Sequence, residues 1–453
     1  MFQVFRNAWM DTQLRKKILY TLFIIVLFRL GSNIFVPFLD NSAISTMMGG
    51  ASLLNYLDVM TGGSLGKGTL LAMSITPYIN ASIIIQLLAV AIPPLEKLQK
   101  EGEEGRKKLN TITKFTSLAL AILQAIAFYF TLRNGYTDSN GVHTAILKYG
   151  DVREANPDMF AVVLSAIVIV ACFVAGASMI IWLGDRINEK GIGNGISMIL
   201  FAGIVSGLPN AVTYFVSLCK ENLANIGFVL LAIVIFIAMV WFVIMMTNAE
   251  RRIPVQYSKK MVGRKLVGGQ ASHIPLKVNT AGVIPVIFAS SIMSFPIVIA
   301  QFFHPDYTTI GGKILMVLNS SYWFRPEMPA YSVGLVIYLV LIVLFAYFYT
   351  SITFNPLEVA NNMKKSGGFI PGIRPGKPTS EYLDKILNYI VFIGAIGLII
   401  VSVIPIIISG VFTVSRLSFM GTSLIIIVSV ILETIKAIES QMIVRNYKGF
   451  LND

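Results

Sequence analysis

Charged residues are scarce in this chain. Asp, Glu, Lys and Arg together make up 13% of its 453 residues, about half the share that a soluble globular domain uses to cover its surface. Hydrophobic residues account for 55%, and the mean hydropathy is +0.74. A soluble or a disordered protein is therefore excluded, and we expect much of the surface to face lipid.

Cysteine and histidine are also rare. Cys172 and Cys219 lie in or beside apolar runs, and His143, His273 and His304 are far apart in polar connections. This pattern supports neither a disulfide framework nor a metal site. The apolar runs contain no acidic pair, no nucleophile–histidine set and no H-E-x-x-H motif. We therefore expect no catalytic centre, no metal and no cofactor.

Long uncharged runs dominate the sequence instead. A helix needs about 20 predominantly apolar residues to cross the hydrocarbon core of a bilayer. The uncharged stretch 41–57 is rich in Gly, Ser and Asn, so we interpret it as a surface loop. Ten other segments are predicted to span the membrane: 18–37 (interrupted by Arg29), 69–95, 115–132, 159–184, 191–219, 222–249, 278–303, 328–357, 386–415 and 417–432.

The distribution of Lys and Arg predicts the orientation of these segments. Connections on the side of the two termini contain 27 of the 36 Lys and Arg residues, and those on the other side contain 8. Because positive charge is retained in cytoplasmic loops, both termini are predicted to be cytoplasmic. The net charge of +13 follows mostly from this asymmetry. Direct DNA binding is not needed to explain it.

Ten spans divide into two halves of five, residues 1–218 and 219–453. An odd number of spans in each half forces the second half to lie inverted relative to the first. The equivalent second and seventh segments both contain the pattern P-x-I-x-A-S, at 77–82 and 285–290. This match is either the trace of a repeat or an accident in an apolar chain. We predict an all-α integral membrane protein with ten transmembrane helices in two inverted, pseudo-symmetric halves.

A glycine-rich stretch, 61–68, precedes the second of these segments. Thr76 followed by Pro77 predicts a helix start inside an apolar run, with Thr76 as the N-cap and Pro77 at the first helical position. The residues before this start are either a separate piece that dips into the membrane, shielded by protein, or an ordinary glycine loop.

Two long connections on the cytoplasmic side carry clustered positive charge. Residues 250–277 alternate apolar and polar residues before a basic stretch, which predicts a protruding hairpin with a cationic tip. Residues 355–385 contain a stretch rich in Gly and Pro with two cations. Such loops either set topology and contact anionic headgroups, or dock a large acidic partner.

Six stretches along the chain are informative when they are taken together: 28–32 (FRLGS), 77–88 (PYINASIIIQLL), 182–197 (WLGDRINEKGIGNGIS), 273–291 (HIPLKVNTAGVIPVIFASS), 364–376 (KKSGGFIPGIRPG) and 421–424 (GTSL). Together they resemble the SecY family, the channel subunits of the bacterial Sec protein translocase. They occur in the family's order over nearly the whole chain. The resemblance implies a channel for unfolded secretory polypeptides in the bacterial plasma membrane, without enzymatic activity. It further implies a clamshell hinged between segments five and six, which opens sideways between segments two and seven and releases membrane segments into lipid.

The resemblance also implies a closed waist and a plug. In the family, a ring of bulky aliphatic side chains closes the pore, and a short helix, the plug, blocks the outer funnel; it corresponds to about 61–73. An apolar collar resists water and ions and offers a passing chain no directional bond. Leu200 stands where the family usually has isoleucine, and the glycines of the plug predict that it is loosely held. The ring positions are Ile75, Ile79, Ile196, Leu200, Ile287 and Ile426, and the plug positions are Gly62, Gly63, Ser64, Leu65 and Gly66.

Gate and docking positions follow from the same resemblance. Proline lets a helix bend, and small residues let neighbouring helices approach closely. The implied gate residues are Pro77, Asn80, Ser82, Asn279, Pro285 and Ser290. The implied docking residues for the ribosome and the SecA motor ATPase are Arg251, Arg252, Arg264, Lys265, Arg374 and Lys377.

Further implied partners are SecE-like and SecG-like small membrane subunits, precursors with signal peptides, and membrane lipid. Two other classes of protein stay open. A small-solute secondary transporter with inverted repeats would need polar or charged groups at the midplane of the membrane, which are sparse in this sequence. A membrane insertase or scaffold without a pore would not need the plug-like insertion.

Overall fold

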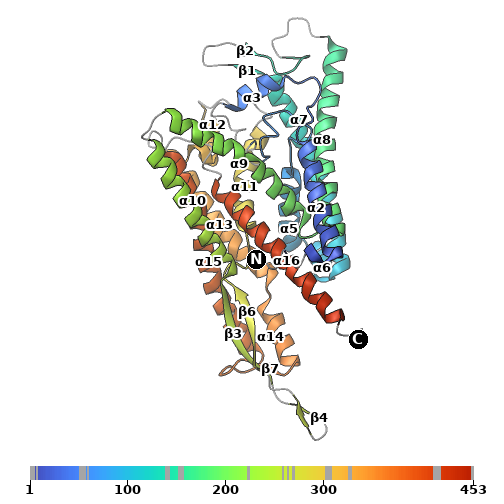
Figure 1. Ribbon diagram of the computed structural model, residues 1–453, viewed down its shortest axis with the longest axis vertical. Coiled ribbons are helices and arrows are strands. Elements are labelled where there is room, and N and C mark those ends of the chain that lie inside the picture. Colours follow the sequence, from blue (N-terminus) through green and yellow to red (C-terminus); the bar gives the residue numbers. More distant parts are fainter. Residues whose placement is uncertain are drawn as a thin grey trace.

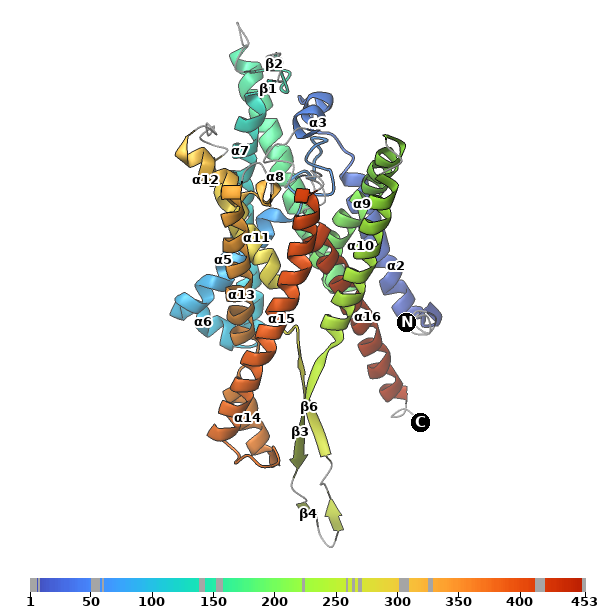
Figure 2. The ribbon, with the colours of Figure 1, turned by 90° about the vertical axis from the view of Figure 1, so that its left-hand side faces the viewer.

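The computed structural model describes residues 6, 9–49, 58, 61–137, 143–151, 158–221, 225–257, 260–262, 265–267, 271–300, 309–324, 329–411 and 420–449. Helices dominate these parts of the chain, as Figures 1 and 2 show. The α-helices are α2 (Thr12–Gly31), α3 (Asn41–Gly49), α5 (Thr76–Ala91), α6 (Pro93–Lys100), α7 (Glu103–Arg133), α8 (Met159–Lys190), α9 (Gly195–Glu221), α10 (Asn225–Asn248), α11 (Ile284–Ala300), α12 (Ile310–Leu318), α13 (Val333–Thr353), α14 (Pro356–Lys365), α15 (Lys377–Val411) and α16 (Met420–Gly449).

Each of the ten predicted membrane segments coincides with one helix: α2, α5, α7, α8, α9, α10, α11, α13, α15 or α16. Among the described residues, five helices are long and apolar enough to cross a membrane, on α7, α8, α10, α13 and α15. The pair α5–α6 would be a sixth, although it is bent by 106°. The all-α membrane fold is thus confirmed, whereas the count of ten spans stays a prediction.

Two local predictions are wrong. Of the predicted loop 41–57, residues 41–49 form α3, because Asp40 accepts hydrogen bonds from the main-chain nitrogens of Ser42 (2.9 Å) and Ala43 (3.4 Å). Its bonds to Ser42 and Ala43 also hold the pKa of the Asp40 carboxyl below its usual value. Residues 50–57 lie outside the described residues. The second error concerns α5, whose N-cap is Ile75 and not Thr76. The Ile75 carbonyl already accepts the first helical hydrogen bonds, so Thr76 lies inside the helix.

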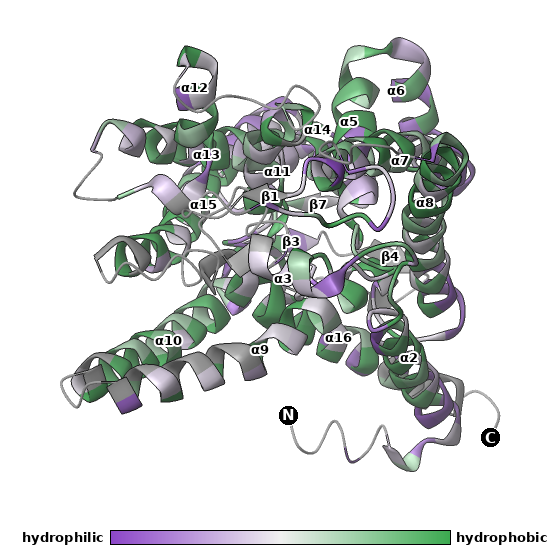
Figure 3. Cartoon of the chain, turned by 90° about the horizontal axis from the view of Figure 1, so that it is seen from above, coloured by the Kyte–Doolittle hydropathy of each residue, from purple (hydrophilic) through white to green (hydrophobic). Residues whose placement is uncertain are grey.

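The helices of the two halves stand side by side. Within residues 1–218, α5 packs on α7, α7 on α8, and α8 on α9; within 219–453, α11 packs on α13 and α13 on α15. Helix α16 contacts α9 and α10, and α5 contacts α11. In the view from above, α2, α5, α7 and α8 lie on one side and α10, α13 and α15 on the other, with α3 over the middle (Figure 3).

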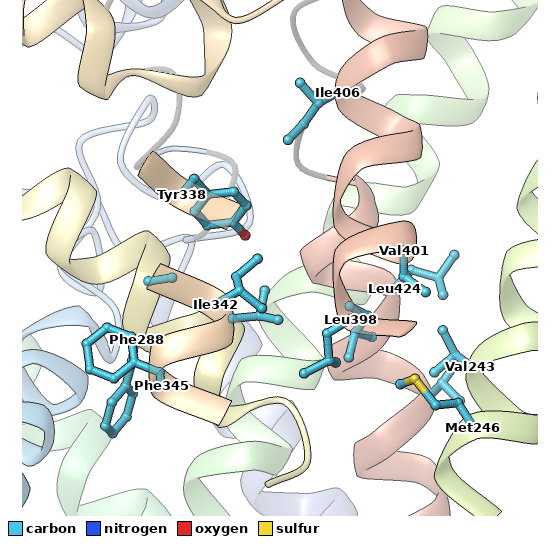
Figure 4. Close-up of a cluster of buried hydrophobic side chains, with 14 of the residues drawn as sticks. Val243, Met246, Phe288, Tyr338, Ile342, Phe345, Leu398, Val401, Ile406 and Leu424 are labelled. Carbon is cyan, nitrogen blue, oxygen red and sulfur yellow. The ribbon is translucent and has the colours of Figure 1, made fainter. Parts of the chain in front are cut away.

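The outer faces of the bundle are apolar, as membrane-spanning helices require. On α10, for example, Leu230, Val234, Ile237 and Trp241 are each about 60% exposed or more. The largest internal cluster joins α10, α11, α13, α15 and α16. Figure 4 shows Phe288 against Phe345, with ring centroids 5.7 Å apart.

A small sheet carries the long hairpin that projects from one end of the bundle (Figures 1 and 2). Strand β3 (Glu250–Tyr257) pairs antiparallel with β6 (Ala271–Lys277) and, on its other edge, with β7 (Gly368–Phe369). Strands β4 (Lys260–Val262) and β5 (Lys265–Val267) form the outer part of the hairpin. The predicted hairpin is therefore present, and β7 joins it to the second basic connection. At the opposite end of the bundle, β1 (Tyr136–Thr137) pairs with β2 (His143–Thr144).

Candidate functional site: the waist and the loop above it

The six predicted ring residues gather in two adjoining apolar clusters. Ile75 is buried with Leu71, Ile180 and Ile199, and the side chains of Ile79, Ile196 and Leu200 pack against this cluster. Ile426 is buried in a second cluster, against which Leu200 and Ile287 pack. Leu200 belongs to both, so it links the ring positions of the first half to those of the second. Their role as a pore constriction stays a prediction.

The chain positions Ile196 and Leu200 through the G-I-G-N-G segment before α9. The Asn188 side chain accepts a hydrogen bond from the Gly195 nitrogen (2.7 Å), and Asn194 accepts one from the Ile196 nitrogen (3.1 Å). A side chain at Gly195 would overlap the carbonyl oxygen of Gly184 on α8. Glycine therefore lets α9 start tight against α8, and the i, i+4 spacing places both ring residues on one face.

The predicted plug is a chain of turns and not a helix. Residues 61–75 form consecutive turns and bends, because Gly62, Gly63 and Gly68 have φ values of 68°, 81° and 59°. A right-handed helix cannot include such residues. The expectation of a loosely held segment is also wrong. Ser64 and Thr69 are buried, and the Thr69 hydroxyl donates to the Ser64 carbonyl at 3.1 Å.

Gly62 brings this loop against α9, beyond the ring residue Leu200. The Ser206 hydroxyl lies 3.4 Å from the Gly62 carbonyl oxygen and donates a shorter bond to the Gly203 carbonyl (2.6 Å). A side chain at Gly62 would overlap the same Gly203 oxygen. The loop is therefore seated directly on the helix that carries two ring positions.

The two predicted gate helices, α5 and α11, touch. Ile83 of α5 is buried in one cluster with Val286 and Ala289 of α11. Asn80 and Asn279 are each 6% exposed, and the amide nitrogen of Asn279 is buried without a hydrogen-bond partner. An unpaired buried polar group costs free energy, so this amide stabilises the fold less than a paired one would.

The remaining gate residues show one error of interpretation. Pro77 and Pro285 are each the second residue of their helix, where no helical hydrogen bond is lost, so neither proline bends its helix. Both prolines are buried. The hydroxyl of Ser82 accepts a bond from Gln86 (3.0 Å), and that of Ser290 donates to the Ile287 carbonyl (2.9 Å).

The docking residues lie at the end of the bundle that carries the hairpin. Arg251, Arg252, Arg374 and Lys377 are exposed. Arg252 forms an ion pair with Glu250 (2.7 Å), and Lys377 lies 3.9 Å from Glu381. Through β3 and β7, the two basic connections share one apolar core that includes Val255, Leu276 and Ile370. Arg264 lies outside the described residues, and of Lys265 only its place on β5 is described.

Sequence reasoning missed a polar group beside the waist. The Tyr78 hydroxyl bonds to Asn110 of α7 (3.2 Å), and Lys114 of α7 forms an ion pair with Asp185 of α8 (2.7 Å). It also missed Asp58, whose carboxylate accepts a bond from the Gly66 nitrogen (2.6 Å). The first two pairs are distant in sequence, and Asp58 and Gly66 are 8 residues apart without forming a recognised motif, so no sequence pattern could have identified them.

These features define a class: a polytopic, mostly helical membrane protein with adjoining apolar clusters at its centre and a loop seated against one of the helices that line them. The described residues contain no group of three His, Cys, Asp or Glu side chains that could hold a metal ion.

The chain belongs to the SecY family, whose model matches residues 69–435. It is 41% identical over 458 aligned residues to the protein translocase subunit SecY of Streptomyces coelicolor, and the alignment covers 100% of both chains. Among solved structures, one concerns a SecY plug domain that stabilises the closed state of the translocation channel and maintains a membrane seal. It has a TM-score of 0.62 at 18% identity and covers 95% of this chain and 93% of the other. A second, a channel in a canine ribosome–channel complex from the endoplasmic reticulum, has a TM-score of 0.61 at 17% identity with the same coverage.

Proposed function

We propose that this protein is the central subunit of a protein-conducting channel. It passes unfolded secretory polypeptides across the membrane and releases apolar segments sideways into lipid. It is a channel subunit and not an enzyme. The full-length match to SecY translocase subunits carries this conclusion. Nothing in the family or in the fold favours a small-solute transporter.

The waist serves as the seal in this proposal. Ile75, Ile79, Ile196, Leu200, Ile287 and Ile426 form the collar, and their packing in two clusters that share Leu200 supports the assignment. The loop 61–73 is the plug on the outer side. Helices α5 and α11 form the lateral gate. Their contact supports this assignment, because α5 belongs to residues 1–218 and α11 to residues 219–453.

The partners are proposed from the same family. The ribosome and a SecA motor ATPase dock at the joined basic connections, around Arg251, Arg252, Arg374 and Lys377. SecE-like and SecG-like subunits cover outer faces of the bundle. The protein lies in a bacterial plasma membrane with both termini cytoplasmic. The start of α2 and the end of α16 lie at the same end of the bundle as the basic hairpin, which supports this orientation (Figure 2).

One experiment tests the function. Purified protein is reconstituted in liposomes with its small subunits, the motor ATPase and ATP, and a precursor with a signal peptide is added outside. We expect the precursor to become protected from protease, and protection to disappear when detergent opens the liposomes. Liposomes that contain every component except this chain are the control. Equal protection in both samples would contradict the proposal.

A further inference from the structure

A short helix, α12, follows the proposed gate helix α11 at the end of the bundle opposite the basic hairpin. Figure 2 shows it leaving the upper ends of α11 and α13 and pointing away from the bundle, and Figure 3 shows it at the edge of the bundle. Thr309 caps its first turn by accepting a hydrogen bond from the Gly312 nitrogen (3.3 Å). Its 9 residues rise about 14 Å, too little to cross a bilayer.

The inner side of α12 is fixed to the bundle. Gly312 and Leu315 are buried. The indole nitrogen of Trp323, a residue that is 3% exposed, donates a hydrogen bond to the Val317 carbonyl (2.6 Å). A side chain at Gly334, in the first turn of α13, would overlap both that carbonyl oxygen and the indole nitrogen. Because these contacts fix the rotation of α12 about its own axis, the same residues always face outward.

The outward side of α12 carries two large apolar residues and one cation. Ile310 is 80% exposed and Ile314 is 56% exposed, and their i, i+4 spacing places them on one face of the helix. Aliphatic side chains of this size favour an apolar environment over water. Lys313 lies beside them and is also exposed, and no carboxylate in the described part of the chain forms an ion pair with it.

This face continues the lipid-facing surface of the neighbouring span. α12 contacts α13 and the short turn η3 (Pro329–Ser332) that precedes it. On α13, which is long and apolar enough to cross a membrane, Val333 and Val340 are 56% and 59% exposed, so the lipid-facing surface begins at its first residue. The rings of Tyr322 and Tyr331 lie beside α12 with their centroids 6.3 Å apart. Tyrosine is enriched where a membrane meets water, so α12 lies at that depth.

We propose that α12 is an interfacial helix in the leaflet opposite the basic hairpin: Ile310 and Ile314 insert among the acyl chains, and Lys313 binds the phosphate of an anionic lipid. In the proposed orientation this is the outer leaflet. Lipid, and not another protein, covers this face because its isoleucines continue the lipid-facing surface of α13. α12 thereby anchors the end of α11 at the membrane surface. The inference requires only that the chain is embedded in a membrane, so it does not rest on the proposed channel function.

The first test measures the depth of α12 in liposomes that contain the full chain. In a background with Cys172→Ala and Cys219→Ala, the variant Ile314→Cys is labelled with a fluorophore. Lipids brominated in their acyl chains should quench this label as strongly as a label at Val340→Cys on α13, and iodide in the water should quench it only weakly. Thr144→Cys, at an exposed position of β2 at the same end of the bundle, is the control and should show the reverse pattern.

Two results of this test would overturn the inference. If iodide quenched the label at position 314 as strongly as the label at position 144, α12 would stand in water. If neither iodide nor the brominated lipids quenched it, protein would cover the face that we assign to lipid. Quenching does not depend on precursor transport, so a chain that fails to transport would contradict the proposed function and leave the position of α12 to be decided by these measurements.

The second test measures the role of Lys313 with the same label at position 314. Brominated phosphatidylglycerol, which is anionic, should reach half-maximal quenching at about fivefold lower mole fraction than brominated phosphatidylcholine, because one lysine at an anionic surface gives a preference of that size. Lys313→Gln should abolish this preference while both lipids still quench, since the isoleucines hold the helix in the bilayer without the charge. Lys148→Gln, at an exposed lysine of the same end of the bundle, is the matched control and should keep the preference. A preference that persists in Lys313→Gln, or is missing from the wild type, would overturn the binding of a lipid phosphate by Lys313.

Discussion

The carbonyl oxygen of Gly62 lies 3.4 Å from the hydroxyl of Ser206, although 144 residues separate them in the chain. This contact places the glycine-rich loop 61–68 on α9, the helix that also carries Ile196 and Leu200. In the proposed channel, the idle seal therefore consists of two stacked layers, a collar and a loop. Each layer can be tested by itself.

The loop layer predicts different effects at two adjacent glycines. Gly62 and Gly63 both have positive φ, at 68° and 81°, so alanine strains the backbone at either position by about 1 kcal/mol. Only at Gly62 would the new side chain meet α9; at Gly63 nothing lies within 4 Å. Gly62→Ala should raise idle ion conductance in planar bilayers, and Gly63→Ala should not. If both variants leaked ions equally, backbone strain alone would explain the leak, and the contact of Gly62 with α9 would not contribute to the seal.

The collar layer predicts a leak when two of its members are removed. Ile79→Gly combined with Ile287→Gly opens the waist from both halves, so idle conductance should rise. Ile233→Gly with Ile237→Gly on the exposed face of α10 is the control, with a similar helix cost of about 1 kcal/mol per glycine. Unchanged conductance in the first double variant would remove both residues from the collar.

The basic connections predict a defect in docking without a defect in folding. Arg374 is exposed between Pro371 and Pro375, so Arg374→Glu reverses charge on a stiff surface. Precursor transport should fall about tenfold or more, since like charges across an interface cost several kcal/mol. Lys313→Glu on α12, at the other end of the bundle, is the matched control. Membrane fractions should contain both variant proteins in the same amount as the wild type. If the Arg374→Glu variant transported precursor at the wild-type rate, the proposed docking role of Arg374 would be contradicted.

The gate predicts that fixing α5 to α11 stops transport. Cysteine pairs are introduced with one member in 77–88 and the other in 278–291, starting from Ile83 and Ala289, which share a buried cluster. A disulfide across the seam should block precursor transport, and reduction should restore it. Pairs between α13 and α15, which pack within one half, are the control and should not block. A gate located elsewhere would leave the cross-linked α5–α11 protein active.

Much of the fold could be predicted because lipid imposes a strong pattern on sequence. Each of the ten long apolar runs in the sequence coincides with a helix of the structure. The alternation of apolar and polar residues in 250–277 predicted the hairpin of β3 and β6. Boundaries were less accurate. α15 begins at Lys377, well before its apolar run, because its first turns pack against the sheet through Leu383.

The finer features of the site depend on contacts that sequence does not display. Glycines in 61–68 suggested a loose segment, whereas the side chains of Asp58, Thr61 and Thr69 bind its backbone at several points. The two P-x-I-x-A-S patterns suggested bends, whereas both prolines stand in first helical turns. In each case the residue type alone was misleading, because the structural context of the glycines and of the prolines decides what they do.

The central claim is that a polypeptide passes through the waist of this protein. A precursor stalled halfway, with a photoreactive side chain at the point that spans the membrane, tests this most directly. After illumination, mass spectrometry identifies the residues that carry adducts. We predict adducts on Ile79, Leu200 and Ile287. Adducts confined to outward-facing residues such as Ile237 and Trp241 would contradict the account, because the polypeptide would then run along the outside of the bundle.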